Sequence, residues 1–498
     1  MTHTLTHRPA NTMYQLRDYQ VEVFDASIDF LNSDQTRAQI YSPTGSGKTV
    51  CFEEVIKKSF SMGYKSIAVL HPRLALSQDQ LSRFKKTSNT AVRYTSFHSG
   101  EHVIGSEQIK ERATTDPTEL NNIIEKTNND GMVHLTFSSY HSFGKLIDKT
   151  KFDLVICDEA HYMVRDQFYK WVDQIPSNKI MFFTATPITN AFEYDPTEQG
   201  MLNYDVFGEV ICAIEPKRLI KAKYIVAPLI HKIECSTTQL GEDVDIIDLV
   251  ARSFVHQYQE MVKSGMTKHH MLVAARNVAR DLRDIESGLV ELWRKIKELD
   301  DTIQTPDVYT IDAGQTNKNN QPLASRVDAM NEIKRTDRNV ILVHYDVLSE
   351  GIDIDSLSGV LLMRVMSKAK LIQTIGRCSR PFRDDMDMFM EPRAELFVNG
   401  QDLRKKPRSL VTIPVIDGKW IANSDSTLIV EAFIAAGYDD IMTYMPKEEL
   451  RPSGNKRPLL VEEYDHFNGK ILQATVDRQL VDLLAVFDKF MAKAKAKK

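Results

Sequence analysis

Two short runs of residues in this chain have the composition and spacing of a nucleotide-binding site. The first is Ser42–Thr49 (Ser-Pro-Thr-Gly-Ser-Gly-Lys-Thr), and the second, about 110 residues further on, is Asp158–His161 (Asp-Glu-Ala-His). Backbone N–H groups can approach a polyphosphate closely only where the residues are small. Carboxylates that follow a buried strand can hold a divalent cation at the edge of a sheet. The pair predicts a site for ATP and Mg²⁺.

The first run has the form of a phosphate-binding loop. Lys48 can place its ammonium group between the β- and γ-phosphates, and the Thr49 hydroxyl can ligate Mg²⁺ at the start of a helix. The strict pattern G-x-x-x-x-G-K-[ST] has glycine where this chain has Ser42, which is small enough to be tolerated. A strand near 38–42 and a helix over 49–60 should flank the loop. The predicted nucleotide-binding set is Thr44, Gly45, Ser46, Gly47, Lys48 and Thr49.

The second run follows the apolar stretch 152–157, which is typical of a strand buried on both faces. Asp158 and Glu159 then lie at the carboxyl end of a strand, where open α/β sheets bind their ligands. We expect Asp158 to hold Mg²⁺ through its water shell, and Glu159 to orient and deprotonate the attacking water. Asp-Glu pairs also occur as acidic N-caps of helices, and this alternative is weaker where a phosphate-binding loop is present.

The pattern of apolar segments predicts the elements that must position these residues. Strands are expected near 38–42, 66–70, 132–136, 153–157 and 180–184, and again near 270–275, 307–311, 339–344 and 358–363. A polar insertion with helix should fill 103–131, and a long charged helix should run over 278–299. Strands that alternate with helices indicate two doubly wound α/β domains with parallel sheets.

The composition is that of a globular protein without a membrane or metal signature. The 498 residues suggest roughly three domains, with 42% apolar and 26% charged residues and a net charge of −5. Neither a long apolar run nor a signal sequence is visible, which predicts a cytoplasmic protein without membrane association. The five cysteines form no C-x-x-C pair, so we expect buried fillers, with Cys157 the clearest example.

The chain resembles the superfamily 2 helicases and translocases of the DEAD/DEAH-box type over nearly all of residues 14–385. Besides the two runs above, the motifs are Arg17–Gln20, His71–Gln78, Thr136–Tyr140, Thr184–Thr186, Ser349–Asp353 and Gln373–Arg380, in the family's order. The resemblance implies two tandem RecA-like domains, of which only the first carries a phosphate-binding loop. We expect them at 1–222 and 223–400, with an accessory region of unknown role at 401–498.

The resemblance also implies a role for each motif. Adenine and nucleotide contacts are expected from Arg17, Gln20, Gly351 and Asp353. Contacts to the nucleic-acid backbone are expected from Pro72, Arg73, Gln78, Ser138 and Ser139. His161, Thr184 and Thr186 should link hydrolysis to movement.

The last motif carries a physical argument of its own. Gln373, Arg377 and Arg380 are spaced to share one face of a helix. A guanidinium group offered from a second domain can neutralise charge on the transferring phosphoryl group, which is typically worth about a thousandfold or more in rate. The two arginines are therefore candidate fingers, whereas the alternative is a basic helix face in solvent.

Nucleic acid is the expected partner, although a net charge of −5 requires that any binding track be local. Basic candidates lie at 404–408 and in the tail at 493–498, and the tail is more typical of solvated lysines at a chain end. The opening motif and the segment 348–353 resemble DNA translocases most, in particular phage branch-migration helicases and the bacterial RadD and eukaryotic XPB groups. The expected function is ATP-dependent remodelling or unwinding of branched or single-stranded DNA. An RNA helicase, the motor of a restriction system and a catalytically silent scaffold are the alternatives.

Overall fold

The computed structural model describes most of the chain between residues 16 and 420. The described residues are 16–87, 92–99, 113–187, 200–235, 245–276, 278–312, 315–345, 354, 356–364, 368–382, 385, 397–398, 401–402, 404–416, 419–420, 460–465 and 470–476. The chain divides into two units, Met1–Glu215 and Pro216–Lys498. The division falls a few residues before the boundary at 222 that the sequence suggested.

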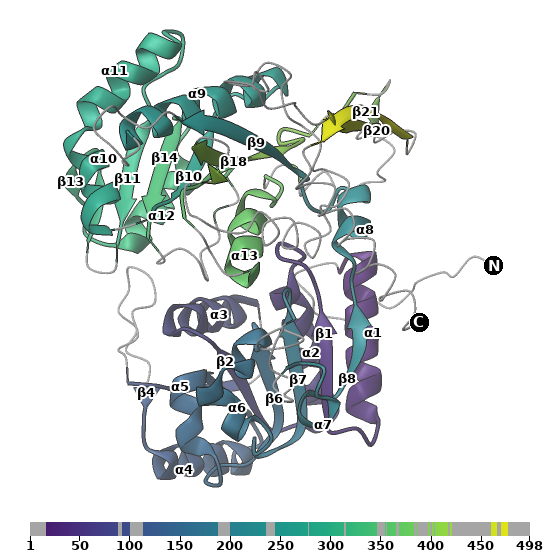
Figure 1. Ribbon diagram of the computed structural model, residues 1–498. Coiled ribbons are helices and arrows are strands. Elements are labelled where there is room, and N and C mark those ends of the chain that lie inside the picture. Colours follow the sequence, from purple (N-terminus) through teal and green to yellow (C-terminus); the bar gives the residue numbers. More distant parts are fainter. Residues whose placement is uncertain are drawn as a thin grey trace. The chain divides into compact units, whose positions relative to one another are not determined.

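The first unit is built on a parallel sheet of eight strands in the order β4-β3-β5-β2-β6-β7-β1-β8 (Figure 1). Its strands are β1 (Arg37–Tyr41), β2 (Ser66–His71), β3 (Val92–Phe97), β4 (Ala113–Thr114), β5 (Val133–Ser139), β6 (Phe152–Asp158), β7 (Ser177–Thr184) and β8 (Glu209–Ala213). Its helices are α1 (Asp18–Asn32), α2 (Lys48–Ser61), α3 (Leu74–Thr87), α4 (Pro117–Asn129), α5 (Tyr140–Phe143), the 3₁₀ turns η1 (Gly144–Leu146) and η2 (Ala160–Val164), α6 (Asp166–Val172) and α7 (Tyr204–Phe207).

The central strands of this sheet are apolar along their whole length because both faces are covered. All six residues of β2 are buried, as are six of the seven in β6. The five strands predicted from the sequence are therefore all present. Three strands at or next to the sheet edges, β3, β4 and β8, were not predicted. The sequence of β3 is mixed and β4 has only two residues, whereas β8 (Glu-Val-Ile-Cys-Ala) is a short apolar run that was overlooked.

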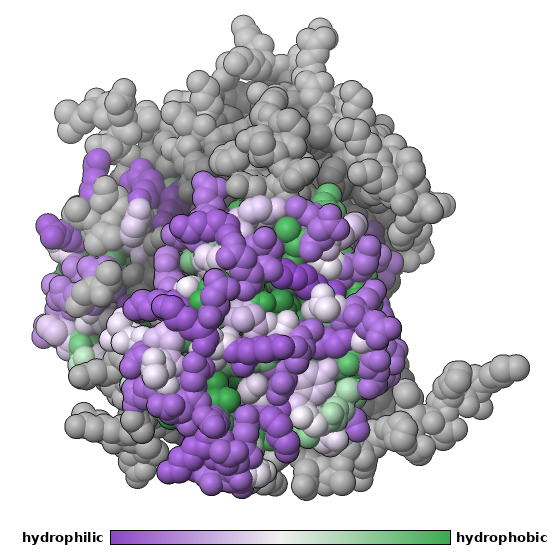
Figure 2. Space-filling model, turned by 90° about the horizontal axis from the view of Figure 1, so that it is seen from below, coloured by the Kyte–Doolittle hydropathy of each residue, from purple (hydrophilic) through white to green (hydrophobic). Residues whose placement is uncertain are grey.

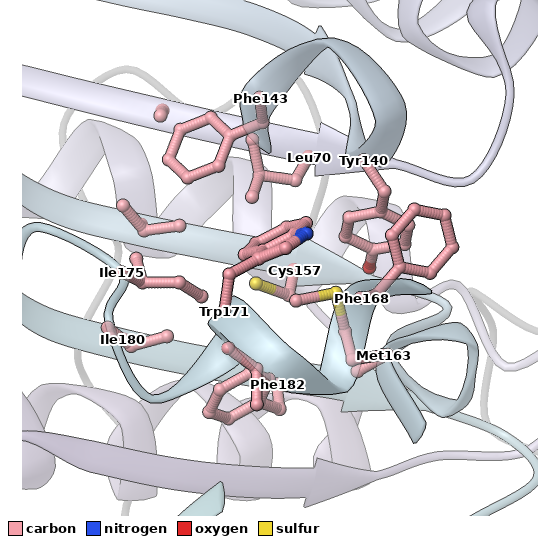
Figure 3. Close-up of a cluster of buried hydrophobic side chains, with 14 of the residues drawn as sticks. Leu70, Tyr140, Phe143, Cys157, Met163, Phe168, Trp171, Ile175, Ile180 and Phe182 are labelled. Carbon is pink, nitrogen blue, oxygen red and sulfur yellow. The ribbon is translucent and has the colours of Figure 1, made fainter. Parts of the chain in front are cut away.

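An aromatic cluster fixes the region that follows β6. Figure 3 shows Trp171 of α6 at the centre of the cluster, with Phe143, Phe168, Ile180 and Phe182 around it. Cys157 of β6 and Met163 of η2 belong to the same buried cluster. The strand and the turn that flank Asp158 and Glu159 are thus held by side chains that do not themselves take part in binding. Cys157 is a buried filler, as expected, and burial raises the pKa of its thiol.

The second unit is a mixed sheet of nine strands in the order β13-β12-β11-β14-β10-β15-β18-β19, with β9 paired to β18. Its strands are β9 (Pro228–Cys235), β10 (His270–Ala274), β11 (Asp307–Ile311), β12 (Thr316–Lys318), β13 (Gln321–Pro322), β14 (Val340–His344), β15 (Gly359–Leu362), β18 (Ser409–Ile416) and β19 (Lys419–Trp420). Its helices are α8 (Pro216–Lys221), α9 (Ile246–Lys263), the π-helical turn η3 (Val278–Leu282), α10 (Arg283–Ser287), α11 (Leu289–Leu299), α12 (Arg326–Arg335) and α13 (Lys368–Cys378). Two further strand pairs are β16 (Phe397–Val398) with β17 (Gln401–Asp402), and β20 (Leu460–Asp465) with β21 (Lys470–Val476).

Alternate residues of the second sheet pack into two cores, one on each face. Met271 and Val273 of β10 join the core with α9, α10 and α11, whereas Leu272 and Ala274 join the core with α12 and α13. Each unit is therefore a doubly wound α/β domain, as the sequence predicted.

Two predicted features of the second unit need correction. The strand β18 pairs in parallel with β15 and with β9, so this fold continues past the boundary expected at residue 400. The helix expected over 278–299 is interrupted at Gly288, where a Cβ atom would lie 2.8 Å from the carbonyl oxygen of Asp284 and 2.8 Å from Ile247.

The described surface has no broad apolar face in the view of Figure 2. Side chains there are mainly hydrophilic, and the hydrophobic ones form small, separate spots. Every helix in the described part of the chain is too short or too polar to cross a lipid bilayer.

Candidate nucleotide site and nucleic-acid segments

The phosphate-binding loop lies between β1 and α2, as predicted. Gly45 and Gly47 have φ values of 82° and 84°, which an L side chain rarely adopts. The Ser42 hydroxyl lies 2.7 Å from the Ser46 hydroxyl, which in turn donates to the Pro43 carbonyl oxygen at 2.6 Å. Ser42, which stands where the strict motif has glycine, therefore makes a hydrogen bond within the loop.

The adenine-motif helix α1 packs directly against this loop. The Gln20 amide donates to the Ser46 carbonyl oxygen at 3.0 Å and accepts from the Arg17 backbone N–H at 3.0 Å. The Tyr19 hydroxyl donates to the same Ser46 oxygen at 2.6 Å. A Cβ atom on Gly47 would lie only 2.6 Å from Gln20 Nε2, so glycine is required here by contact as well as by φ. The structure therefore brings Arg17 and Gln20 to the loop, and Tyr19 is a partner that sequence reasoning missed.

The two carboxylates follow β6 as expected and face the loop lysine. Lys48 Nζ lies 3.5 Å from Glu159 Oε1, and the lysine side chain is 9% exposed. Glu159 has a left-handed backbone with φ 52°, an uncommon conformation for a residue with a Cβ atom. Such backbone positions cluster at functional sites.

Asp158 is almost fully buried and is held from several directions. Its Oδ1 accepts from the Glu159 backbone N–H at 3.0 Å, and its Oδ2 accepts from Gln80 Nε2 at 2.9 Å. His71 Nδ1 lies 3.6 Å from the same Oδ2.

Burial alone would raise the pKa of the Asp158 carboxyl. The combined effect of His71, the charge of Lys48 and the Gln80 hydrogen bond is opposite and larger than that of burial. The pKa therefore lies below its ordinary value. Asp158 is thus an ionised carboxylate, which is the form that holds a cation.

The residues expected to couple hydrolysis to movement meet behind the carboxylates. His161 Nδ1 lies 3.0 Å from Thr184 Oγ1 and 3.3 Å from Thr186 Oγ1. The Thr186 backbone N–H donates to Thr184 Oγ1 at 3.1 Å. Burial lowers the pKa of His161 to about 3, so its imidazole is neutral. The Ser42 N–H donates to the Thr184 carbonyl oxygen at 2.9 Å, which joins this triad to the phosphate-binding loop.

The site fits a magnesium–triphosphate group by the chemistry of its donor set. Thr44 Oγ1 is buried, and among the described residues no group hydrogen-bonds to it. An unpaired buried hydroxyl beside a glycine-rich loop and a lysine is explained by a ligand that would accept from it. Thr49 is the second residue of α2, and its hydroxyl could ligate Mg²⁺ together with Asp158.

The residues expected to contact nucleic acid differ in whether their side chains are accessible to a ligand. Pro72 and Arg73 lie between β2 and α3, and Gln78 lies on α3. The Ser138 hydroxyl is fully buried and donates to the Phe97 carbonyl oxygen at 2.8 Å, so it is not presented to a ligand in this structure. The Ser139 hydroxyl accepts from the Ser142 backbone N–H at 3.2 Å and so caps α5.

Arg165, which follows η2, is a basic residue that sequence reasoning missed. Its guanidinium group lies over the Tyr162 ring, 3.9 Å from the ring centroid. Its pKa is lowered, first by burial and then by the positive charge of Arg73. Two arginines close enough to repel each other form a local positive spot on an acidic protein, of the kind that a nucleic-acid phosphate would stabilise.

In the second unit, the last motif lies on and just after α13. Gln373 and Arg377 are on the helix and buried, with 6% and 7% exposure. The helix ends at Cys378, so Arg380 follows it and does not share its face, which corrects the sequence interpretation. Gly351 and Asp353 lie outside the described residues.

The basic cluster at 404–408 is largely structural. Lys406 is fully buried, and its ammonium group donates to the carbonyl oxygens of Leu357 and Arg380. The backbone N–H groups of Lys405 and Lys406 donate to the Asp385 carboxylate at 2.6 and 2.8 Å. Only Lys405 and Arg408 of this cluster are exposed. The basic tail at 493–498 lies outside the described residues.

Two family models match parts of this chain. The family model described as "Type III restriction enzyme, res subunit" matches residues 13–189, and the model described as "Helicase conserved C-terminal domain" matches residues 293–381. A comparison with curated proteins found no match.

Among solved structures, the ATP-dependent Type ISP restriction-modification enzyme LlaBIII bound to DNA superposes with a TM-score of 0.62 at 14% identity. The match covers 85% of this chain but only 30% of that enzyme. A nuclease-deletion mutant of the Type ISP enzyme LlaGI, in complex with a DNA substrate mimic, gives 0.48 at 15% identity, covering 84% of this chain and 29% of that one. A fragment of a putative HsdR subunit of a type I restriction enzyme from Vibrio vulnificus gives 0.44 at 17% identity, covering 82% and 70%.

The fold is thus that of two RecA-like α/β units, of which the first carries a phosphate-binding loop. The two family matches make the chain similar to helicases over residues 13–189 and 293–381.

Proposed function

We propose that this chain is an ATP-dependent DNA translocase or helicase, with Mg²⁺ as the metal cofactor. The observation that carries the proposal is the arrangement in the first unit, where Lys48 of the loop faces Glu159 at 3.5 Å. Glu159 also lies 3.5 Å from His161, which contacts Thr184. A phosphate-binding lysine, a candidate base and a coupling triad are thus joined by direct contacts.

The roles of the site residues follow from their chemistry. Lys48 would neutralise the β- and γ-phosphates, and Glu159, released from Lys48 by the phosphates, would accept a proton from the attacking water. Thr49 and Asp158 would hold Mg²⁺, which would supply positive charge to the phosphate group. Arg377 and Arg380 would supply positive charge from the second unit.

DNA is the proposed substrate because the LlaBIII structure, which shares this fold, is bound to DNA. The match to the res-subunit model favours a second, more specific candidate, the motor of a restriction system. Remodelling of branched or single-stranded DNA, as in phage branch-migration helicases, remains a prediction from the motifs. An RNA helicase would share the same backbone contacts and is distinguished only by experiment.

The test is ATP hydrolysis measured in parallel with single-stranded DNA, duplex DNA, four-way junctions and RNA. We expect stimulation by DNA above that by RNA. Stimulation by duplex alone would favour a restriction-type translocase, whereas a preference for junctions would favour branch migration. Lys48→Ala is the control and should remove the stimulated activity, because the phosphate charge is no longer neutralised. If RNA stimulates hydrolysis more strongly than every DNA, the proposed substrate is wrong.

A further inference from the structure

Asp158 receives hydrogen bonds from both segments that are expected to contact nucleic acid. Its Oδ2 accepts from Gln80 Nε2 at 2.9 Å, and Gln80 lies on α3, the helix that begins directly after Arg73. Its backbone carbonyl oxygen accepts from the Tyr140 hydroxyl at 2.5 Å, and Tyr140 follows Ser139. The proposed magnesium ligand is therefore the residue at which the two segments meet.

The environment of Gln80 is unusual for a glutamine that only fills the core. Gln80 is 4% exposed, and because a carboxylate can only accept, its amide nitrogen must face Asp158. Its Oε1, the Ser77 hydroxyl and His71 Nε2 are buried, and none has a hydrogen-bond partner among the described residues, while His71 Nδ1 faces Asp158 Oδ2 at 3.6 Å, beyond hydrogen-bond distance. Buried polar atoms are nearly always paired in folded proteins. Such a group of unsatisfied atoms on β2 and α3, the elements that present Gln80 and His71 to Asp158, indicates a functional role.

We propose that Gln80 is a positioning residue that couples nucleic-acid contact at the start of α3 to the binding of Mg²⁺ by Asp158. This inference rests on the proposed function of the site. A phosphate bound near Arg73 shifts or stiffens α3, and because α3 is a continuous helix the shift reaches Gln80 and orients the carboxylate. Coupling between two sites is reciprocal, so nucleic acid strengthens Mg²⁺ binding by the same factor by which Mg²⁺ strengthens nucleic-acid binding.

The experiment is a Mg²⁺ titration, with and without duplex DNA, of both ATP hydrolysis and the equilibrium binding of a fluorescent, non-hydrolysable ATP analogue, in the parent protein and in Gln80→Leu. The Mg²⁺ dependence of analogue binding should shift in the same direction as that of hydrolysis. Leucine has a similar volume and no donor. In the parent, DNA should lower the Mg²⁺ concentration for half-maximal activity. In Gln80→Leu that concentration should rise by about tenfold, the size of one hydrogen bond to a charged group, and the effect of DNA on it should disappear. The KM for ATP at saturating Mg²⁺ should change little.

Two further variants separate positioning from packing. Tyr140→Phe removes only the hydroxyl that contacts the Asp158 carbonyl, and it should weaken the same DNA effect while the protein stays folded. Gln259→Leu is the matched control, because Gln259 Nε2 donates to Asp300 Oδ2 at the same 2.9 Å on the surface of the second unit. It should leave the Mg²⁺ titration unchanged.

Each outcome decides the matter. If the parent hydrolyses ATP and Gln80→Leu keeps the parental effect of DNA on Mg²⁺, the coupling role is wrong while the proposed function stands. If DNA does not change the Mg²⁺ requirement of the parent, the coupling role is also wrong and the proposed function still stands. A parent without nucleic-acid-stimulated hydrolysis overturns both.

Discussion

At the scale of single residues, the site depends on the contact between Lys48 and Glu159. Without a ligand, the carboxylate is the counter-ion of the lysine at 3.5 Å. A bound triphosphate would take over that role and leave Glu159 to act on water. The left-handed backbone at Glu159 points the residue out of the strand direction of β6, which supports a role in chemistry over one in the sheet.

Glu159→Gln should therefore abolish hydrolysis while ATP binding is retained. Glutamine keeps the size of the side chain and can still orient a water molecule, but it cannot accept the proton. Loss of a general base typically lowers the rate by about 10²- to 10⁴-fold. Steady-state hydrolysis and titration with a fluorescent ATP analogue would measure the two effects separately. A normal rate in this variant would show that the base is another group.

At the scale of elements, the sequence predicted the central strands, whose carboxyl ends carry the candidate catalytic residues, but not the strands near the edges of the sheet. The apolar run 152–157 identified β6 and placed Asp158 at its end, because a strand buried on both faces must be apolar throughout. In contrast, β3 (Val-Arg-Tyr-Thr-Ser-Phe) lies near one edge and is partly exposed, so its sequence resembles a loop.

Contacts between distant side chains could not be predicted at all. Gln80 and Asp158 are 78 positions apart, and no spacing rule connects a helix residue to the end of a strand that comes seven elements later. The break at Gly288 was missed for a similar reason, since the close approach of Ile247 that favours glycine comes from another helix. The motifs identified the candidate residues, whereas the packing of α3 against β2 and β5 brings Gln80 to Asp158.

The loop between β1 and α2 gives a prediction at this scale. Gly47→Ala should weaken ATP binding, because the new Cβ would displace Gln20 from Ser46 and also strain a residue with φ 84°. Gly63→Ala is the matched control at the other end of α2. Gly63 has φ 95°, and no atom of the described residues lies within 4 Å of a Cβ there.

Both variants should be less stable by about 1–2 kcal/mol, the cost of a left-handed residue with a side chain. Only Gly47→Ala should change nucleotide affinity. Thermal unfolding and nucleotide titration of the two proteins would test this, and equal affinities would show that Gln20 does not shape the loop.

At the scale of the whole molecule, buried neutral histidines in both units predict how stability depends on pH. Burial is the largest cause that lowers the pKa of His134 in the first unit to about 4. The same cause lowers the pKa of His269 and His270 in the second unit to about 3 and about 4. Their ordinary value is 6.5, so the unfolded chain binds more protons than the folded chain between these limits.

The stability from these groups is therefore complete above pH 6.5 and is lost as the pH falls towards 4. We expect the thermal midpoint to fall steadily from pH 7 to pH 5 and to be almost flat from pH 7 to pH 8. Calorimetry across this range measures it. The variant His134→Gln should flatten the acid slope of the first unit, and an unchanged slope would show that His134 is not the group responsible.

At the same scale, the proposed function requires that residues of both units act on the same nucleotide. Lys48 and Glu159 belong to the first unit, whereas Arg377 and Arg380 belong to the second. A finger acts on the charge of the transition state, so Arg380→Ala should lower kcat by about a thousandfold or more while ATP affinity changes little. Arg338→Ala is the control, because Arg338 is an exposed arginine of the second unit, 3.6 Å from the buried carboxylate of Asp307. Single-turnover hydrolysis and equilibrium ATP binding separate the two quantities. Equal turnover in the parent and in Arg380→Ala, together with a loss of turnover in Arg377→Ala, would assign the finger to the helix α13 instead.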